Sequence, residues 1–174
     1  MTKQELEALV AQGPVLLDGA MGSCLLELGM PKGTLSELWA DQHPEVVLEL
    51  QAAYAAAGSR ILYAPTFQAQ PATLEQAGWT GDVAALNARL VRLTRRAAGK
   101  EALVAGDLAP MAGCMESWVP ENFHRMTELY RRQIGGLLEG GADLLAAETL
   151  LYPQEAEAVL LAAELEGGGV PVLY

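Results

Sequence analysis

DLLAAE, at residues 143–148, is a short apolar run that follows a glycine pair and ends on a carboxylate. Buried strands of parallel sheets read this way, because helices cover the sheet and leave little place for polar residues. Similar runs begin near residues 14, 60, 102 and 170, and segments with helical apolar spacing separate them. The order βαβαβαβαβ predicts a parallel sheet covered by helices. Two architectures fit this order: an open doubly wound sheet, or part of a (β/α)8 barrel.

The expected helices carry recognisable boundary residues. Thr2 and Glu5 have the spacing of a capping box at the start of the first helix. Pro44 suits the first turn of a later helix, and Gly58 suits the position just after its end. The expected first strand covers residues 14–19 and ends close to an acid.

The composition indicates one globular domain over residues 1–174, with 51% hydrophobic residues available for a core. Asp and Glu number 22 against 11 Lys and Arg, a net charge of -11, which argues against nucleic-acid and anionic-membrane partners. No apolar run reaches the ~18 residues of a membrane span, and the first residues lack the order of a signal peptide. Two cysteines make no disulfide framework. We therefore expect a cytoplasmic protein.

Common nucleotide, hydrolase and metal motifs are missing from the sequence. The glycines of DGAMGS, residues 18–23, have the wrong spacing for a dinucleotide fingerprint or a P-loop, and there is no Gly-x-Ser-x-Gly elbow. His43 and His124 lack the neighbours of a local metal motif. Cys24 and Cys114 are too few for a thiolate-rich zinc site without further ligands, and small buried hydrophobes are the simpler interpretation.

Three predicted strands end on acids, namely Asp18, Asp107 and Glu148. The carboxyl ends of parallel strands line the active sites of α/β proteins, although acids there also cap helices and form turns. For Asp107 both interpretations stay open. Gly19 and Gly22 beside Asp18 would let the backbone approach a ligand closely. Glu148 leaves the core directly after an apolar run and needs a partner such as a substrate ammonium group.

Other side chains near the strand ends have a structural and a functional interpretation. Thr66 and Phe67 follow the second predicted strand. The Thr66 hydroxyl could belong to a turn or contact a ligand, and the Phe67 ring could belong to the core or line a pocket. Trp39 and Trp118 are expected in loops before helices, and packing is favoured over substrate contact for both.

Five segments stand in order along the chain: DGAMGS (18–23), HPEVV (43–47) with AGS (57–59), PTF (65–67), GDLAPMAG (106–113) and GADLLAAET (141–149). Together they resemble motifs of the homocysteine S-methyltransferase family. The resemblance runs from about residue 13 to the end and is nearest to the homocysteine-binding barrel of cobalamin-dependent methionine synthase.

The resemblance implies a (β/α)8 TIM barrel, of which this chain holds about the first half: four βα units and the start of strand five. It implies methyl transfer to the thiol of homocysteine to form methionine. A zinc ion held by three cysteines would activate the sulfur, and methylcobalamin on a corrinoid-carrying domain, or a small molecule, would donate the methyl group. The implied substrate-binding residues are Asp18, Gly19, Ala20, Met21, Gly22, Thr66, Phe67 and Glu148.

The chain also departs from the family. The family's zinc cysteines lie beyond Tyr174, so we expect no catalytic residue and no metal ligand here, and Pro65 stands where the family has Asn. A complete barrel takes ~250 residues, more than this chain supplies. The first and fifth strands would therefore be open sheet edges, which are suited to self-association. The chain is then a fragment, half of a paired assembly or a degenerate relative, with little turnover alone. The alternatives are a non-catalytic binding or assembly module and a methyltransferase for another substrate.

Overall fold

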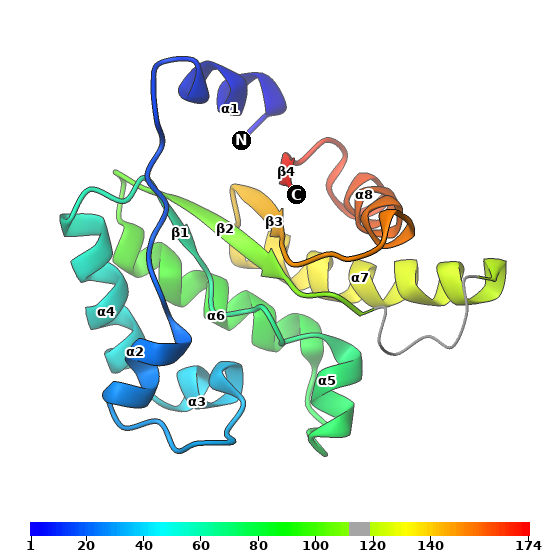
Figure 1. The fold of residues 1–174 in the computed structure, drawn as a ribbon, viewed down its shortest axis with the longest axis horizontal. Helices are drawn as coiled ribbons and strands as arrows, with labels where there is room; N and C mark the ends of the chain where they lie inside the picture. The colour runs from blue at the N-terminus through cyan, green and yellow to red at the C-terminus, as the bar shows by residue number, and fades with distance from the viewer. Residues whose placement is uncertain (112–118) are drawn as a thin grey trace.

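The computed structural model describes residues 1–111 and 119–174 and shows helices packed on a parallel four-stranded sheet (Figure 1). The strands follow one another in sequence order, and each pairs in parallel with the next. A doubly wound sheet would reverse this order at a switch point. The predicted α/β class is confirmed, and the described strands form an open sheet, not a closed barrel. They are β1 (Ile61–Tyr63), β2 (Leu103–Leu108), β3 (Leu144–Ala147) and β4 (Val172–Leu173).

The main helices begin and end close to the predicted boundaries. At the first one, the Thr2 hydroxyl accepts a hydrogen bond from Glu5 N at 3.2 Å and Thr2 N donates to the Glu5 carboxylate at 2.7 Å, which completes the capping box. Pro44 opens its helix, and Gly58 follows the end with a φ of 107°. The helices are α1 (Lys3–Val10), α2 (Gly22–Glu27), α3 (Ser36–Gln42), α4 (Pro44–Ala56), α5 (Pro71–Gln76), α6 (Val83–Ala98), α7 (Pro120–Gly140) and α8 (Pro153–Gly167).

The expected first strand at residues 14–19 is wrong as a regular strand. Leu17 makes a single parallel bridge to Ile61, and Asp18 N donates to the Ile61 carbonyl at 3.1 Å. The segment therefore runs beside β1, where a first strand would stand. Leu16 and Leu17 are exposed, so their side chains make no buried packing that would stabilise a longer strand.

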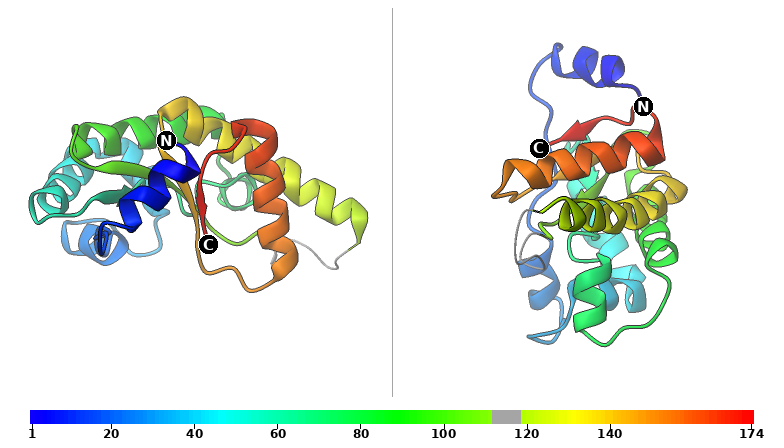
Figure 2. Two further views of the ribbon diagram at one scale, coloured as in Figure 1. Left: turned by 90° about the horizontal axis from the view of Figure 1, so that it is seen from above. Right: turned by 90° about the vertical axis from the view of Figure 1, so that its right-hand side faces the viewer.

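Helices α4, α6, α7 and α8 lie side by side on one face of the sheet (Figure 2). The largest core lies between them and the sheet, and Leu62, Val104 and Leu145 point into it from the strands. Helices α6 and α7 approach closely, since a Cβ at Gly136 would stand 2.4 Å from the carbonyl oxygen of Ala84. A side chain there would force the two helices apart.

The opposite face of the sheet is less fully covered. Leu6 of α1 packs there against Ile61, Ala105 and Leu144. Since successive strand residues point to opposite faces, Tyr63 and Asp107 belong to this face too. Alternate side chains of the sheet thus point toward the layer of helices and toward the less covered face.

Several details differ from the sequence-based expectation. Strand β2 continues to Leu108, so Asp107 lies within the strand and not at its end. Trp39 belongs to α3 and not to a loop, and its 7% exposure confirms the packing interpretation. The short helices α2, α3 and α5 go beyond the prediction, because one or two turns leave little periodicity to detect. Cys114 and Trp118 lie outside the described residues.

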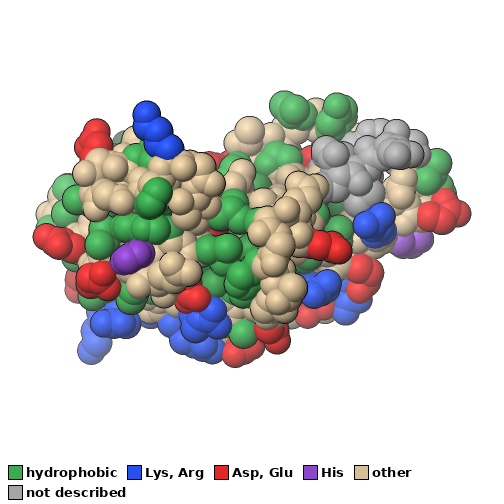
Figure 3. Space-filling view, turned by 90° about the horizontal axis from the view of Figure 1, so that it is seen from below, with side chains coloured by type: hydrophobic (Ala, Val, Ile, Leu, Met, Phe, Trp, Pro, Cys, Tyr) green, Lys and Arg blue, Asp and Glu red, His purple; other side chains and the backbone are tan. Residues whose placement is uncertain are grey.

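The surface mixes charged and apolar groups. Viewed from the end that carries α2, α3 and α5, hydrophobic side chains occupy the middle of the face, and charged ones lie mostly around its margin (Figure 3). Among the described helices, none combines the length and the apolar character needed to cross a bilayer.

Candidate functional site

A cavity of about 430 Å³ opens where the parallel strands end. Its walls come from the segment 17–22, from α3 and from the carboxyl ends of β1, β2 and β3. Parallel strands deliver the residues at their carboxyl ends to one edge of the sheet, so acids far apart in the sequence meet here.

Asp18 enters the cavity from the segment beside β1. Its Oδ2 accepts a hydrogen bond from Tyr63 N at 3.0 Å, and its own N–H donates to the Ile61 carbonyl at 3.1 Å. Burial raises the pKa of Asp18 to about 6; backbone hydrogen bonds oppose the rise, and the charge of Glu148 adds to it. The carboxyl group is thus held in place at the wall of the cavity.

Asp107 is the most buried acid of the three that the strands bring together, with 7% exposure. Burial raises its pKa to about 8, and the charges of Glu148, Asp18 and Glu37 add to the rise. The hydroxyl of Thr66 donates to the Asp107 carbonyl at 2.9 Å and accepts from the Asp107 N–H at 3.0 Å. One buried hydroxyl therefore fixes the backbone of Asp107.

Glu148 follows β3 directly and is exposed at the cavity. Its N–H donates to the Leu108 carbonyl at 3.3 Å, which carries the pairing of β2 and β3 up to this residue. The next residue, Thr149, has a φ of 63°, in the left-handed region that residues other than glycine seldom adopt. The chain turns sharply there and leaves Glu148 at the rim.

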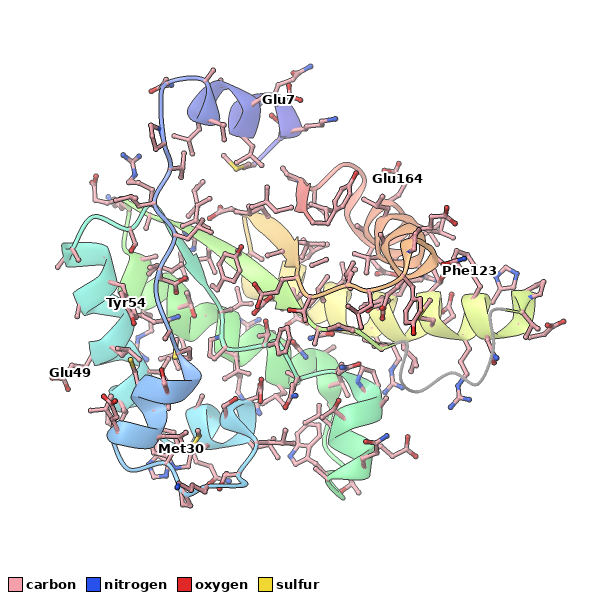
Figure 4. All side chains as sticks on the ribbon, in the orientation of Figure 1. Glu7, Met30, Glu49, Tyr54, Phe123 and Glu164 are labelled. Atoms are coloured by element: carbon pink, nitrogen blue, oxygen red, sulfur yellow. The ribbon has the colours of Figure 1, made fainter. Side chains whose placement is uncertain are left out.

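The backbone of residues 19–22 forms another wall of the cavity. Tyr54 reaches from α4 to this segment, and its hydroxyl donates to the Ala20 carbonyl at 3.0 Å (Figure 4). A Cβ at Gly19 would stand 2.7 Å from the Tyr54 ring, so only glycine lets the ring support the segment at this distance.

Thr66 and Phe67 have different places in the structure. Phe67 lines the cavity, whereas Thr66 is fully buried behind it and hydrogen-bonds to the backbone of Asp107. The structure thus brings together Asp18, residues 19–22, Phe67 and Glu148, and it sets Thr66 one layer back. Their roles in substrate binding stay predictions.

The cavity also contains residues that the sequence reasoning missed. Glu37 is only 2% exposed, and its carboxylate accepts hydrogen bonds from Gln68 N at 2.8 Å and from the Ser36 hydroxyl at 3.0 Å. A glutamate in a short polar helix carries no signal of burial. Tyr63 lines the cavity too, and the two-residue alternation of a strand could have placed it on the same face as the acids.

The walls of the cavity are rich in carboxyl groups. Asp18, Glu37, Asp107 and Glu148 all line it, and no Lys, Arg or His occurs among its described lining residues. Carboxylates without cationic partners favour a positively charged ligand, and charge-assisted hydrogen bonds to an ammonium group are short and strong. The arrangement therefore suits a small molecule with an amino group.

Comparison with known families places the chain in one of them. A family model described as homocysteine S-methyltransferase matches residues 15–173. The chain belongs to the homocysteine S-methyltransferase family.

Relatives in this family match most of the chain but extend well beyond it. An Escherichia coli homocysteine S-methyltransferase is 31% identical over 170 residues, covering 85% of this chain and 54% of the relative. A zebrafish (Danio rerio) betaine–homocysteine S-methyltransferase 1 is 30% identical over 158 residues, covering 87% of this chain and 38% of the relative. The chain thus spans about half, or less, of the length of these relatives.

Solved structures show the same relation. The metallated form of the E. coli homocysteine methyltransferase MmuM superposes with a TM-score of 0.77 at 28% identity, over 92% of this chain and 62% of that one. Its oxidized form gives a TM-score of 0.79 over 96% of this chain and 63% of that one.

The described residues do not fit the zinc site that the family resemblance implies. Within residues 1–111 and 119–174, no group of three or more His, Cys, Asp and Glu side chains is arranged to hold a metal ion. Cys24 is half-buried in α2, with its Sγ 3.7 Å from the Tyr54 hydroxyl, and Cys114 lies in the undescribed segment.

Proposed function

We propose that this chain is the homocysteine-binding portion of a methyltransferase that transfers a methyl group to the homocysteine thiol to form methionine. In this proposal Asp18 and Glu148 hold the ammonium group, and the backbone of residues 19–22 together with Phe67 encloses the rest of the amino acid. Thr66 acts through the backbone of Asp107. The observation that carries the proposal is the cavity with four carboxyl groups and no described basic residue in its lining.

The sheet is further proposed to be the first half of a (β/α)8 barrel. Its sequential parallel order and its row of outer helices support this arrangement. Strands that follow in a longer chain would complete the wall around the cavity and bring the zinc-binding thiolates. The methyl group would then arrive from methylcobalamin on a corrinoid-carrying domain or from a small molecule. The proposed location is cytoplasmic, because two cysteines make no disulfide framework. No step proposed for this chain depends on zinc.

Calorimetric titration of reduced L-homocysteine into the chain tests the proposal. Because each acid would lose a charge-assisted hydrogen bond, Asp18→Asn and Glu148→Gln should each weaken binding by about 10- to 100-fold. Glu45→Gln is the matched control, since Glu45 is an exposed acid beside His43 and away from the cavity. If both cavity variants bind homocysteine as tightly as the control does, the proposed role of these acids is wrong.

A non-catalytic assembly module is the second candidate function. Apolar side chains at the two edges of the sheet favour it: Leu16, Leu17 and Tyr174 are 59%, 46% and 80% exposed. Unpaired strand edges promote association with another chain. Sedimentation of the chain separates the candidates, because a stable homodimer without homocysteine binding supports the module. Binding of a different thiol in place of homocysteine would indicate a methyltransferase for another substrate.

A further inference from the structure

Asp107 is the one cavity acid whose side chain has an oxygen that is both buried and unpaired among the described residues. The residue is 7% exposed, and its Oδ1 has no hydrogen-bond partner there. Glu37, the other deeply buried acid of the cavity, accepts two hydrogen bonds through its carboxylate. A buried carboxyl oxygen without a donor is costly unless the group is neutral or a ligand supplies the donor.

The titratable side chains that face Asp107 among the described residues are three acids and a tyrosine. Asp18 comes from the segment beside β1, Tyr63 from β1 itself, Glu37 from α3 and Glu148 from the end of β3. No described Lys, Arg or His lines this cavity. Burial, and then these neighbouring carboxylates, raise the pKa of Asp107 to about 8 against an opposing backbone hydrogen bond from Leu108, which favours the protonated form at neutral pH.

We propose that Asp107 exchanges its proton for the ammonium group of the incoming amino acid, as a third carboxylate of the amine site beside Asp18 and Glu148. This inference rests on the proposed function and deepens it, because it names how the same site adapts its charge to the ligand. The neutral carboxyl group releases one proton to solvent and becomes a carboxylate. The ammonium group keeps its protons and donates a hydrogen bond to Oδ1. Its positive charge replaces that of the released proton, so the net charge of the amine site is the same before and after binding.

The exchange has a measurable signature. Binding at pH 7 should release about one proton, and affinity should rise by about tenfold per pH unit between pH 6.5 and 7.5 through linkage. A ligand without an amino group offers no cation to replace the proton. Its binding should therefore release none and should not strengthen with pH.

The experiment is a calorimetric titration of the chain with L-methionine at pH 7, in phosphate and in Tris, whose ionisation enthalpies differ. Methionine has the amino acid part of homocysteine but no thiol, so a released proton comes from the protein. The expected result is about one proton for the unaltered chain and close to none for Asp107→Asn. Glu45→Gln is the matched control, because Glu45 is an exposed acid away from the cavity, and it should keep the proton release.

The outcomes separate this inference from the proposed function. Methionine binding with the same proton count in the unaltered chain and Asp107→Asn overturns the exchange and leaves the amine site standing. A des-amino methionine that binds with the same proton release also overturns it. If neither methionine nor homocysteine binds, the proposed function and the exchange fall together.

A second measurement needs no ligand. Carbon-13 NMR of the aspartate carboxyl groups should show one aspartate that titrates near pH 8 in the free chain, and Asp107→Asn should remove that signal. A free chain in which every aspartate titrates below pH 6.5 would overturn the exchange, whatever the binding data show.

Discussion

The two ends of the sheet use aspartate in opposite ways. At the amino end, just before β3, Asp143 Oδ2 accepts a hydrogen bond from Val104 N at 2.8 Å and forms an ion pair with Arg95. At the carboxyl end, Asp107 has a buried oxygen with no partner among the described residues and only acids as charged neighbours. Asp143 is therefore held by an ion pair and a backbone hydrogen bond, whereas Asp107 keeps one buried carboxyl oxygen without a described partner.

This difference separates structure from function within one sheet. Arg95 also donates to the Gly141 carbonyl at 3.0 Å, so the ion pair ties α6 to the turn between α7 and β3. Asp143 is thus engaged by contacts within the fold. The carboxyl end keeps its acids without basic partners in the described lining, which costs stability and leaves binding capacity for a cation.

The largest expected effect concerns Asp107, at the carboxyl end of the sheet. The pKa of Asp107 is about 8 in the folded chain, against about 4 when unfolded, so the folded state holds the proton more tightly. Stability from this group is therefore fully present below pH 4 and is lost as pH rises toward 8. Asp107→Asn should raise the free energy of unfolding by about 5 kcal/mol at pH 8 and change it little at pH 4.

Urea unfolding of both proteins across this pH range measures the effect, with Glu45→Gln as the control for a general change of charge. If Asp107→Asn is no more stable than the parent at pH 8, the ionised Asp107 does not destabilise the fold, and the contrast between the two ends of the sheet is wrong.

A smaller effect, in this case a loss of stability, is expected at the amino end of the sheet. Asp143→Ala removes the partner of Arg95 and the acceptor of Val104 N, both at half-buried positions. Since hydrogen bonds to charged groups contribute about 2 kcal/mol, the free energy of unfolding should fall by that amount at pH 7. Chemical denaturation checks this value. A loss below about 0.5 kcal/mol would mean that the amino end does not depend on this ion pair.

The smallest effect is expected at an exposed ion pair between α6 and α7. Arg92 and Glu139 lie 2.9 Å apart, but their side chains are 52% and 64% exposed. Exposed pairs contribute little because water screens them, so Arg92→Ala should change stability by less than about 0.5 kcal/mol. Thermal unfolding at low and high salt measures it. An effect as large as that of Asp143→Ala would show that burial is not what distinguishes the two pairs.

Local patterns predicted much of the fold, while short pairing and burial escaped them. The capping box of α1 and the boundaries of α4 follow from chemistry within a few residues, and the structure confirms them. Residues 14–19 have the apolar character of a strand, yet they form one bridge, because pairing depends on what covers the strand. Glu37 shows the same limit at the site, since its burial comes from contacts with a loop about thirty residues away.

By itself, the sequence determined the alternation of helices and strands, the excess of acids and the motifs of the homocysteine S-methyltransferase family, since these depend on residue type and spacing along the chain. Only the tertiary structure decided which acids are paired and which are not. Parallel strands bring Asp18, Asp107 and Glu148 to one cavity and place Asp143 beside Arg95 at the other end. The charge state of a carboxyl group depends on burial and on neighbours that are distant in sequence, and folding alone brings those together.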